Sequence, residues 1–445
     1  MSLKKFSSYF FNSSLSLLIK NSSRLFIADI FVQGISFVQA LIVARLLGVS
    51  DFGLLALITV YVVIINQVVD FRIRETVVKY VSEFLVKNDK QRLWATIRLC
   101  YFIDISTGVL AFLLVISTAG LAANYLFHRP DTQGLISFYA IILLFSTVDG
   151  TCLGILTVFD KFLSLSIYSM ISTLVKFILV ISFLSYSRSI HSVLTAYIIG
   201  SFLSSLILIY ISIKTIRNSF WHKGIKGGLS LLSGRKAEIT KFLLNTNINE
   251  LLTLFTKNID VLILGYFRMP LEVGYYRLAK NFVEAITLVS APVSTAIYPQ
   301  ISKLWSSNKI KELKILIKRA TILLAGITLP IAVLLFFFSG VIIQYFLGVS
   351  YLPAAQSIRI MLWGLLVAVI LLWVRPFYLS IGRPGVLSLI NVFNAFTMFI
   401  FSLIIVPKFG FIGSSIMYVY PYLVGHVLAL FFLYRLINKA LKSEV

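Results

Sequence analysis

Long apolar runs, separated by short polar segments, dominate the chain from residue 25 onward. A helix needs roughly 20 apolar residues to cross the hydrocarbon core of a bilayer, and about twelve runs of that length occur. The pattern predicts an all-α integral membrane protein with about twelve transmembrane helices. The predicted spans are 25–47, 52–70, 99–120, 135–157, 163–185, 192–213, 242–266, 276–299, 320–341, 357–380, 385–406 and 411–434.

A polar stretch rich in Gly, Ser and Lys interrupts these runs at residues 214–241 and divides the predicted spans into two groups of six. We interpret it as a flexible cytoplasmic linker between two six-helix bundles. The expected order is an N-terminal cytoplasmic segment, a first bundle, the linker, a second bundle and a cytoplasmic tail. Their predicted bounds are 1–23, 24–213, 214–241, 242–435 and 436–445.

The N-terminal segment lacks the long apolar core of a cleavable signal peptide. Leu3, Phe6, Phe10 and Leu17 fall near one helical face, which favours an amphipathic helix lying on the cytoplasmic lipid surface. A partly ordered tail is the alternative.

The composition agrees with a membrane protein and excludes several other classes. Hydrophobic residues make up 59% of the chain and charged residues only 13%, whereas a soluble domain carries about 25% charged residues. A soluble enzyme, a secreted disulfide scaffold and a disordered protein are therefore excluded. The net charge of +23 would suggest a nucleic-acid partner in a soluble chain, but a mean hydropathy of +0.94 favours membrane lipid instead.

The positive charges are distributed unevenly between the two sides of the predicted topology. Short cytoplasmic loops carry an excess of Lys and Arg. The two termini and the even-numbered loops contain 29 of the 40 Lys and Arg residues, and the odd-numbered loops contain five. We therefore expect both termini to be cytoplasmic and the chain to lie in the cytoplasmic (inner) membrane.

The two halves of the chain align with each other at an almost constant offset of 220 to 222 residues. Because six spans is an even number, both halves keep one orientation, which predicts a parallel pseudo-two-fold repeat, a known transporter design. Chance similarity of loop lengths is the alternative. The matching segments are 51–53 with 272–274, 88–93 with 308–313, 125–127 with 345–347, and 160–161 with 382–383.

Ionisable residues inside predicted spans form the first group of candidate functional residues, because such groups are costly in lipid and usually serve function. The repeat offset places Asp29 of the first span on Glu250 of the seventh, so the first helices of both halves present related polar faces. The candidates for coupling-ion binding or gating are Asp29, Asp70, Arg74, Glu250, Asp260 and Glu284.

Cations in or beside the spans form the second group. Together they predict a cationic cavity that suits a phosphate or carboxylate group, because Arg and Lys replace the lost hydration of an anion. The alternative is that pairs such as Lys257 with Asp260, or Arg277 with Glu284, serve only helix packing. The predicted substrate-binding residues are Arg24, Lys176, Lys257, Arg277, Lys280 and Arg375.

Catalytic and metal-binding signatures are missing from the sequence. It contains no GxxxxGK[ST] phosphate loop, no HExxH and no CxxC motif, which are the spacings that nucleotide, zinc and redox chemistry require. Cys100 and Cys152 lie in apolar runs and are expected to be packing residues. We predict no cofactor, no metal site and no enzymatic activity.

Three segments resemble a known family. ARLLGVSDFGLLAL at 44–57, DVLILGYFRMPLEVGYYRLAKNF at 260–282 and PVSTAIYPQISKLW at 292–305 are similar to the Wzx-like polysaccharide biosynthesis flippases of the multidrug/oligosaccharidyl-lipid/polysaccharide exporter superfamily. The resemblance covers residues 20–435. The segment Asp70-Phe71-Arg72-Ile73-Arg74 departs from the Asp-Phe-Gly-Leu type of many relatives.

The resemblance implies two six-helix bundles arranged as a V around a central cationic cavity. It also implies translocation of an undecaprenyl-pyrophosphate-linked glycan, such as an O-antigen repeat unit, from the cytoplasmic to the outer leaflet by alternating access. A proton or sodium gradient would drive this transport, and polysaccharide polymerase machinery would be a partner. The alternatives are a multidrug/cation antiporter of the same superfamily, and a membrane glycosyltransferase or an assembly scaffold for polysaccharide synthesis.

Overall fold

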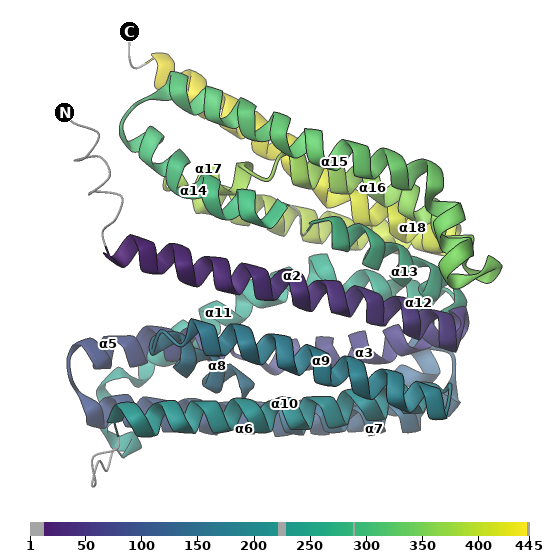
Figure 1. Ribbon diagram of the computed structural model, residues 1–445, viewed down its shortest axis with the longest axis horizontal. Helices are drawn as coiled ribbons and strands as arrows, with labels where there is room; N and C mark the ends of the chain where they lie inside the picture. The colour runs from purple at the N-terminus through teal and green to yellow at the C-terminus, as the bar shows by residue number, and fades with distance from the viewer. Residues whose placement is uncertain (1–12, 221–227, 288–289, 443–445) are drawn as a thin grey trace. The chain divides into compact units, whose positions relative to one another are not determined.

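The computed structural model describes residues 13–220, 228–287 and 290–442, and within these ranges the regular structure is entirely helical (Figure 1). In this described part, nine helices are long and apolar enough to cross a membrane. They are Ser23–Leu47, Val49–Val86, Lys90–Leu126, Pro130–Val158, Phe162–Tyr186, Ile190–Asn218, Ile310–Leu347, Ala354–Ser380 and Pro384–Leu433.

The difference between nine helices and twelve predicted spans arises at two places. Predicted spans eleven and twelve lie within α18 (Pro384–Lys442), which consists of two helices joined at a kink, where Gly410 has φ 57° and ψ −134°. Predicted spans seven and eight fall on four shorter helices, α11 (Lys236–Lys257), α12 (Ile259–Phe267), α13 (Pro270–Thr287) and α14 (Ala291–Ser306). The count of twelve spans stays a prediction.

The chain forms two compact units that alternate along the sequence. Unit 1 comprises Met1–Gln39, Ile65–Ala119 and Gln133–Glu250, and unit 2 comprises Ala40–Ile64, Gly120–Thr132 and Leu251–Val445. Each unit is described by itself below. The predicted bundle boundaries and the V-shaped cavity stay predictions.

Unit 1 contains most helices of the first half of the chain. The long helices are α2 (Ser13–Leu47, up to Gln39), α6 (Lys90–Leu121), α9 (Phe162–Tyr186) and α10 (Ile190–Phe220). The shorter ones are α4 (Ile73–Thr76), η1 (Val77–Val81), α5 (Ser82–Val86), α7 (Gln133–Ser146) and α8 (Asp149–Val158).

Part of the predicted linker is folded onto unit 1. The 3-10 helix η4 (Leu229–Arg235) and the start of α11 bury Leu232, Ile239 and Leu243 in one core cluster with Tyr80 and Phe84. The flexible-linker interpretation is therefore wrong for residues 229–241. Residues 221–227 lie outside the described ranges.

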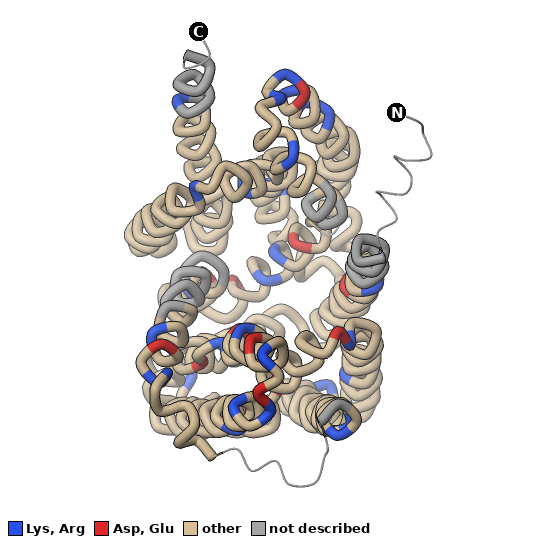
Figure 2. The backbone as a smooth tube through the Cα atoms, turned by 90° about the vertical axis from the view of Figure 1, so that its left-hand side faces the viewer, with Lys and Arg blue, Asp and Glu red and all other residues tan. Residues whose placement is uncertain are grey.

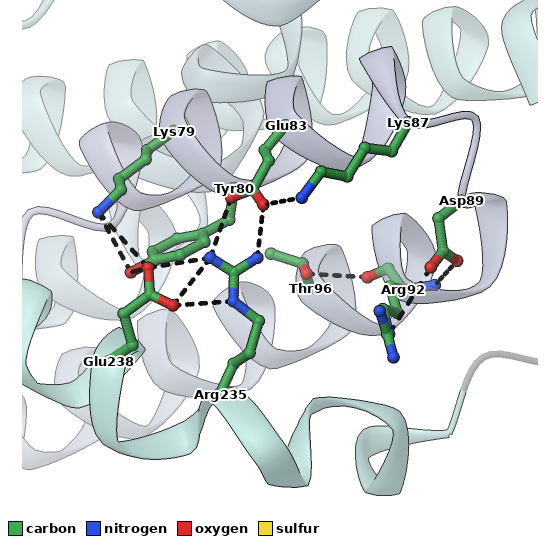
Figure 3. Close-up of polar contacts among 9 residues, drawn as sticks. All are labelled: Lys79, Tyr80, Glu83, Lys87, Asp89, Arg92, Thr96, Arg235 and Glu238. Carbon is green, nitrogen blue, oxygen red and sulfur yellow. Dashed lines mark hydrogen bonds and ion pairs between the residues drawn. The ribbon is translucent and has the colours of Figure 1, made fainter.

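Charged contacts reinforce this packing (Figure 3). Arg235 makes bidentate contacts to Glu83, with Nη1–Oε1 2.8 Å and Nη2–Oε2 3.0 Å, and its Nε donates to Glu238 Oε2 at 2.8 Å. The Tyr80 hydroxyl donates to Glu238 Oε1 at 3.2 Å. Hydrogen bonds from Arg235 hold the pKa of Glu238 below its usual range. The carboxylates of Glu238 and Glu83 in turn raise the pKa of Arg235. We call residues 229–238 the strap.

Unit 2 contains the N-terminal part of α3 (Val49–Val69), the π-turn η2 (Ala122–Leu126), the 3-10 turn η3 (Pro130–Thr132) and helices α12 to α18. Its remaining elements are α15 (Ile310–Leu347), η6 (Val349–Tyr351), α16 (Ala354–Ile370) and α17 (Val374–Ser380). A core cluster packs Trp373, Phe377 and Tyr378, at and within α17, against α14 and α15. The Tyr378 hydroxyl donates to the carbonyl of Ala429 at 2.7 Å, so its polar atom is satisfied in the core.

The turns that join helices recur at the repeat offset. Asn88 and Asn308 both have φ 54°, and the residue after each donates its N–H to a carbonyl five positions back, Asp89 to Phe84 and Lys309 to Leu304. Residues with positive φ also stand at two further pairs of offset-matched positions, His128 with Gly348 and Asp160 with Gly382. Local geometry therefore repeats where the sequence predicts it, although the bundle symmetry stays a prediction.

Two repeat-related glycines meet inside unit 2. A Cβ added at Gly53 of α3 would overlap the backbone oxygen of Pro270, and one added at Gly274 of α13 would overlap the backbone oxygen of Val49. Gly53 and Val49 correspond to Gly274 and Pro270 at an offset of 221 residues, so the contact is reciprocal. Glycine at both positions is what lets the two backbones come this close.

Candidate functional site

The apolar helical stretch Val49–Val86 is broken in unit 1, at the end of the second predicted span. Helix α3 ends at Val69, residues 70–72 are non-helical, and α4 starts at Ile73. Arg72 has φ 50° and ψ 53°, the left-handed region that L-residues other than Gly seldom adopt. In transporters, interrupted helices at membrane depth mark substrate and ion sites. The departure from the family pattern at Asp70–Arg74 therefore coincides with a structural discontinuity.

Helix α11 satisfies a carbonyl group that the break frees. The side-chain amide of Asn247 donates to the carbonyl of Asp70 at 2.5 Å. The Thr246 hydroxyl lies 3.5 Å from the carbonyl oxygen of Phe71, farther than from the Leu243 carbonyl of its own helix at 2.9 Å. The Asp70 carboxylate in turn accepts the N–H of Arg72 at 3.0 Å. Because a backbone group in lipid must find an internal partner, the polar face predicted for α11 has a structural role here.

A buried carboxylate lies beside the break. Asp104 of α6 is 5% exposed, and its Oδ2 accepts the N–H of Thr151 at 2.9 Å and the Thr151 hydroxyl at 2.6 Å. A Cβ added at Gly150 would lie 3.5 Å from both carboxylate oxygens and 3.8 Å from the backbone N of Arg74. Among the described side chains, no Lys or Arg forms an ion pair with Asp104, so its carboxylate is held by neutral donors.

A second polar group in unit 1 involves α8, α9 and α10. The Ser205 hydroxyl donates to Asp149 Oδ1 at 2.8 Å, and the charges of Asp149 and Lys176 interact. Lys176 packs against Gly200, where an added Cβ would lie 2.7 Å from the Lys176 Cγ. Lys176 is therefore a partly buried cation that interacts electrostatically with Asp149.

Unit 2 contains a buried ion pair between α12 and α13. Lys280 Nζ lies 2.6 Å from Asp260 Oδ2, and both side chains are nearly fully buried. The Tyr276 hydroxyl donates to the same oxygen, and the N–H of Val261 donates to Asp260 Oδ1 at 2.8 Å. The Lys280 ammonium also lies 5.9 Å from the ring centres of Tyr276 and of Tyr418 on α18. Removing either partner would leave a buried charge uncompensated.

The predicted cations therefore differ in their surroundings. Lys280 is neutralised by Asp260, a pairing that sequence spacing did not predict. Arg24 and Arg277 are partly buried and Arg375 is exposed. Lys257 lies on α11, and its side chain is outside the described ones. Their predicted role in substrate binding stays a prediction.

The predicted acids are likewise dispersed. Asp29 of α2 and Glu284 of α13 are exposed, Asp70 lies in the helix break, and the Glu250 side chain is outside the described ones. Arg74 is exposed just after the break. Of the predicted site residues, the structure brings Asp260 and Lys280 together in an ion pair.

Two functional candidates escaped the sequence prediction, namely Asp104 and Asp149. Each is a lone carboxylate in or beside an otherwise apolar predicted span. The cost of an ionisable group in lipid is the signal that could have identified them. Figure 2 marks the described Lys, Arg, Asp and Glu positions on the backbone.

Family models match most of the chain. A model described as "Polysaccharide biosynthesis protein" matches residues 18–305. A second model, MatE, matches residues 247–404.

Two relatives are similar over most of their length. The uncharacterized membrane protein MJ1068 of Methanocaldococcus jannaschii is 24% identical over 83% of this chain and 74% of its own length. The probable low-salt glycan biosynthesis flippase Agl15 of Haloferax volcanii is 21% identical over 92% of this chain and 82% of its own length.

Solved structures share the fold. An inward-facing multidrug resistance transporter of the MATE family, a member of the MOP superfamily, has a TM-score of 0.72 at 14% identity, covering 92% of this chain and 96% of its own. The lipid II flippase MurJ in an inward closed conformation has a TM-score of 0.69 at 21% identity, covering 92% and 87%. Both likenesses show that the chain shares the fold of these two proteins.

Proposed function

The chain belongs to the polysaccharide biosynthesis protein family, and on that premise we propose that it flips a polyprenyl-pyrophosphate-linked oligosaccharide from the cytoplasmic to the outer leaflet of the cell membrane. The observation that carries the proposal is the family match over residues 18–305, which includes the helix break and the Asp260–Lys280 pair. The glycan flippase Agl15, similar over 92% of this chain, supports the same substrate class. The matched families are transporters rather than catalytic enzymes.

Cations supply the recognition of the anionic head group. Arg24 and Lys176 of unit 1, and Lys257, Arg277 and Arg375 of unit 2, are the side chains that we propose to meet the phosphates during transport. Arg suits this task because its planar fork of donors matches phosphate oxygens. Lys280 is assigned a different role, because its charge is already compensated by Asp260.

Carboxylates supply the coupling to a proton or sodium gradient. Among the described side chains Asp104 accepts hydrogen bonds from Thr151 and forms no ion pair with a cation, so it can gain a proton without breaking a pair. Asp260 can bind a cation only if Lys280 leaves it. Asp29, Asp70 and Glu250 remain further candidates. A ligand shifts a conformational equilibrium only through different affinities for the two states, and an exchange of partners at Asp260 meets that requirement.

Flipping in reconstituted vesicles tests the proposal. The triple variant Lys257→Ala, Arg277→Ala, Arg375→Ala should lose flipping of a lipid-linked oligosaccharide. A matched control, Lys161→Ala, Arg188→Ala, Arg383→Ala, removes three cations from predicted loops and should retain it. Full activity of the first triple variant would reject the cationic recognition.

A multidrug/cation antiporter is the second candidate function. The MatE match at residues 247–404 and the likeness to a MATE transporter support it. Deletion of the gene separates the two functions. Loss of surface polysaccharide with accumulation of a lipid-linked glycan on the cytoplasmic side supports the flippase, whereas drug sensitivity with intact polysaccharide supports the antiporter.

A further inference from the structure

Residues 303–319 of unit 2 carry an unusual density of positive charge at the corner between α14 and α15. We call this segment the basic corner. It contains six cations and a single acid, Glu312. The cations, all exposed, are Lys303, Lys309, Lys311, Lys314, Lys318 and Arg319. In the described structure only Lys309 pairs with Glu312, at 2.8 Å, so the other five charges stay uncompensated by the protein itself.

The cations of α15 alternate with apolar side chains on one outward face. Lys311, Ile315, Lys318 and Ile322 follow i, i+4, i+7 and i+11 spacing, which places them in one row along the helix. Ile315 is 51% exposed and Ile322 is 59% exposed. The opposite face holds Leu313, Ala320 and Leu324, which are buried in unit 2. The row therefore faces away from the core of unit 2.

This row runs directly into the membrane-spanning part of the same helix. Helix α15 has 38 residues, about 57 Å at 1.5 Å per residue, whereas the hydrocarbon core is about 30 Å thick. Exposed apolar side chains continue along α15 from Ile322 through Val333 to Phe346. Helix α15 is thus long enough for its first turns to extend beyond the hydrocarbon core to the level of the lipid headgroups, where Lys stems can lie along apolar surface with their charges in the headgroup layer.

The repeat-related corner of unit 1 shows that this charge is not required by the turn. Residues 83–99 form the same left-handed turn, at Asn88 instead of Asn308, but contain four cations and two acids. Lys87 pairs with Glu83 at 2.7 Å, and Arg92 pairs with Asp89 at 3.6 Å. The same turn therefore carries four cations against two acids, a net charge of +2, in one half and six cations against one acid, a net charge of +5, in the other.

We propose that the basic corner docks on anionic phospholipid headgroups of the surrounding bilayer. A cluster of four to eight Lys and Arg next to a membrane span recognises anionic lipid, and each cation near such a surface strengthens binding by about fivefold. The complementarity is both electrostatic and apolar, because Ile315 and Ile322 enter the bilayer beside the cations. The docking is independent of the transported substrate.

A fluorescence experiment on the full-length chain in nanodiscs tests the proposal. The substitution Ser307→Cys, labelled with a donor fluorophore, reports on the basic corner, and Cys100 and Cys152 escape labelling because they are buried. Nanodiscs of phosphatidylcholine receive increasing phosphatidylglycerol that carries a headgroup acceptor. We compare the fraction of labelled lipid at which energy transfer saturates. This fraction should be lower when the acceptor is attached to phosphatidylglycerol than when it is attached to phosphatidylcholine. In 1 M salt the difference should disappear.

Changing Lys311, Lys314 and Lys318 to Gln should raise the half-saturating fraction of the anionic acceptor roughly tenfold or more. The matched control, Gln at Lys90, Arg92 and Arg98, removes the same number of charges from the other corner and should leave energy transfer from the labelled position 307 unchanged. Equal response to both acceptors, or an equal effect of both triple variants, would overturn the proposal. The first of these results would point instead to an acidic protein as the occupant. No glycan lipid is present, so the outcome does not depend on flipping.

Discussion

Unit 1 and unit 2 each bury a carboxylate among their helices, but they satisfy it in different ways. Asp260 of unit 2 is held by the Lys280 ammonium and the Tyr276 hydroxyl. Asp104 of unit 1 is held by the N–H and hydroxyl of Thr151, with no ion pair to a described cation. The Lys280 ammonium stabilises the charged form of Asp260. The neutral donors of Thr151 can hydrogen-bond to Asp104 in either protonation state. A buried acid can therefore be a structural element or a titratable one, depending on its donors.

The largest expected effect comes from removing the cation of unit 2. Lys280→Met should lower the free energy of unfolding by about 3–5 kcal/mol, because it leaves Asp260 buried and unpaired. Thermal unfolding in detergent measures this. The double variant Lys280→Met, Asp260→Asn should recover most of the loss, since it removes the stranded charge. A Lys280→Met protein as stable as the native one would mean that Asp260 is not charged.

A smaller effect is expected from truncating the acid of unit 1. Asp104→Ala should cost about 1–3 kcal/mol, because it leaves the N–H and the hydroxyl of Thr151 without an acceptor. Unfolding of Asp104→Ser, which keeps a small polar side chain, gives a second measurement of the same loss. If Asp104→Ala proves as costly as Lys280→Met, the proposed difference between the two carboxylates is wrong.

Neutralisation of Asp104 without truncation should cost still less. Asp104→Asn keeps an oxygen that accepts from Thr151, so we expect a change within about 1 kcal/mol of native stability. In vesicles, however, the variant should flip substrate at a rate that no longer responds to an imposed proton gradient. A gradient response equal to that of the native protein would remove Asp104 from the coupling mechanism.

The smallest effect should come from the exposed carboxylate of the strap. Because Arg235 lowers the pKa of Glu238, the folded protein binds this proton less readily than the unfolded chain. The stabilisation is therefore present above the ordinary Glu pKa of 4.5 and is lost as the pH falls below it through the lowered value. Arg235 stays protonated throughout.

The loss of this stabilisation at low pH should be measurable by hydrogen exchange at residues 229–243. After correction for intrinsic exchange rates, these residues should open locally faster at about pH 3 than at about pH 6. Global unfolding of unit 1 should change little, since exposed ion pairs contribute little in water. The variant Glu238→Gln should open equally at both pH values. Unchanged pH dependence in Glu238→Gln would assign the effect to another acid, with Glu83 the first to examine.

The sequence predicts the helical membrane fold well, because long apolar runs in a chain with 59% hydrophobic residues have few stable structures other than membrane-spanning helices. Its errors fall where polarity and helix breaks coincide. The linker interpretation failed at residues 229–241 because alternating Leu, Ser and Lys residues do not reveal that Leu232 and Ile239 pack into a core. The seventh predicted span was divided because Asn258 separates α11 from α12.

The candidate site was harder to predict for a geometric reason. Helical spacing shows which residues share a face of one helix, but Asp260 and Lys280 lie on different helices, and their contact depends on how α12 and α13 pack. Asp104 and Asp149 have no polar neighbours at helical spacing that form an extended polar face, so a search for such faces passes over them. Their partners, Thr151 and Ser205, are common residues that indicate nothing by themselves.

The reciprocal contact at Gly53 and Gly274 has a consequence for sequence change. At each position the atom that would meet a new side chain is a backbone oxygen, of Pro270 or of Val49. A smaller neighbouring side chain cannot relieve such a clash, because the oxygen is present whatever residue carries it. Second-site suppressors of Gly53→Ala or Gly274→Ala should therefore not arise among the contacting residues. The sequences of the two halves can diverge widely elsewhere, but at these two matched positions both halves must keep glycine.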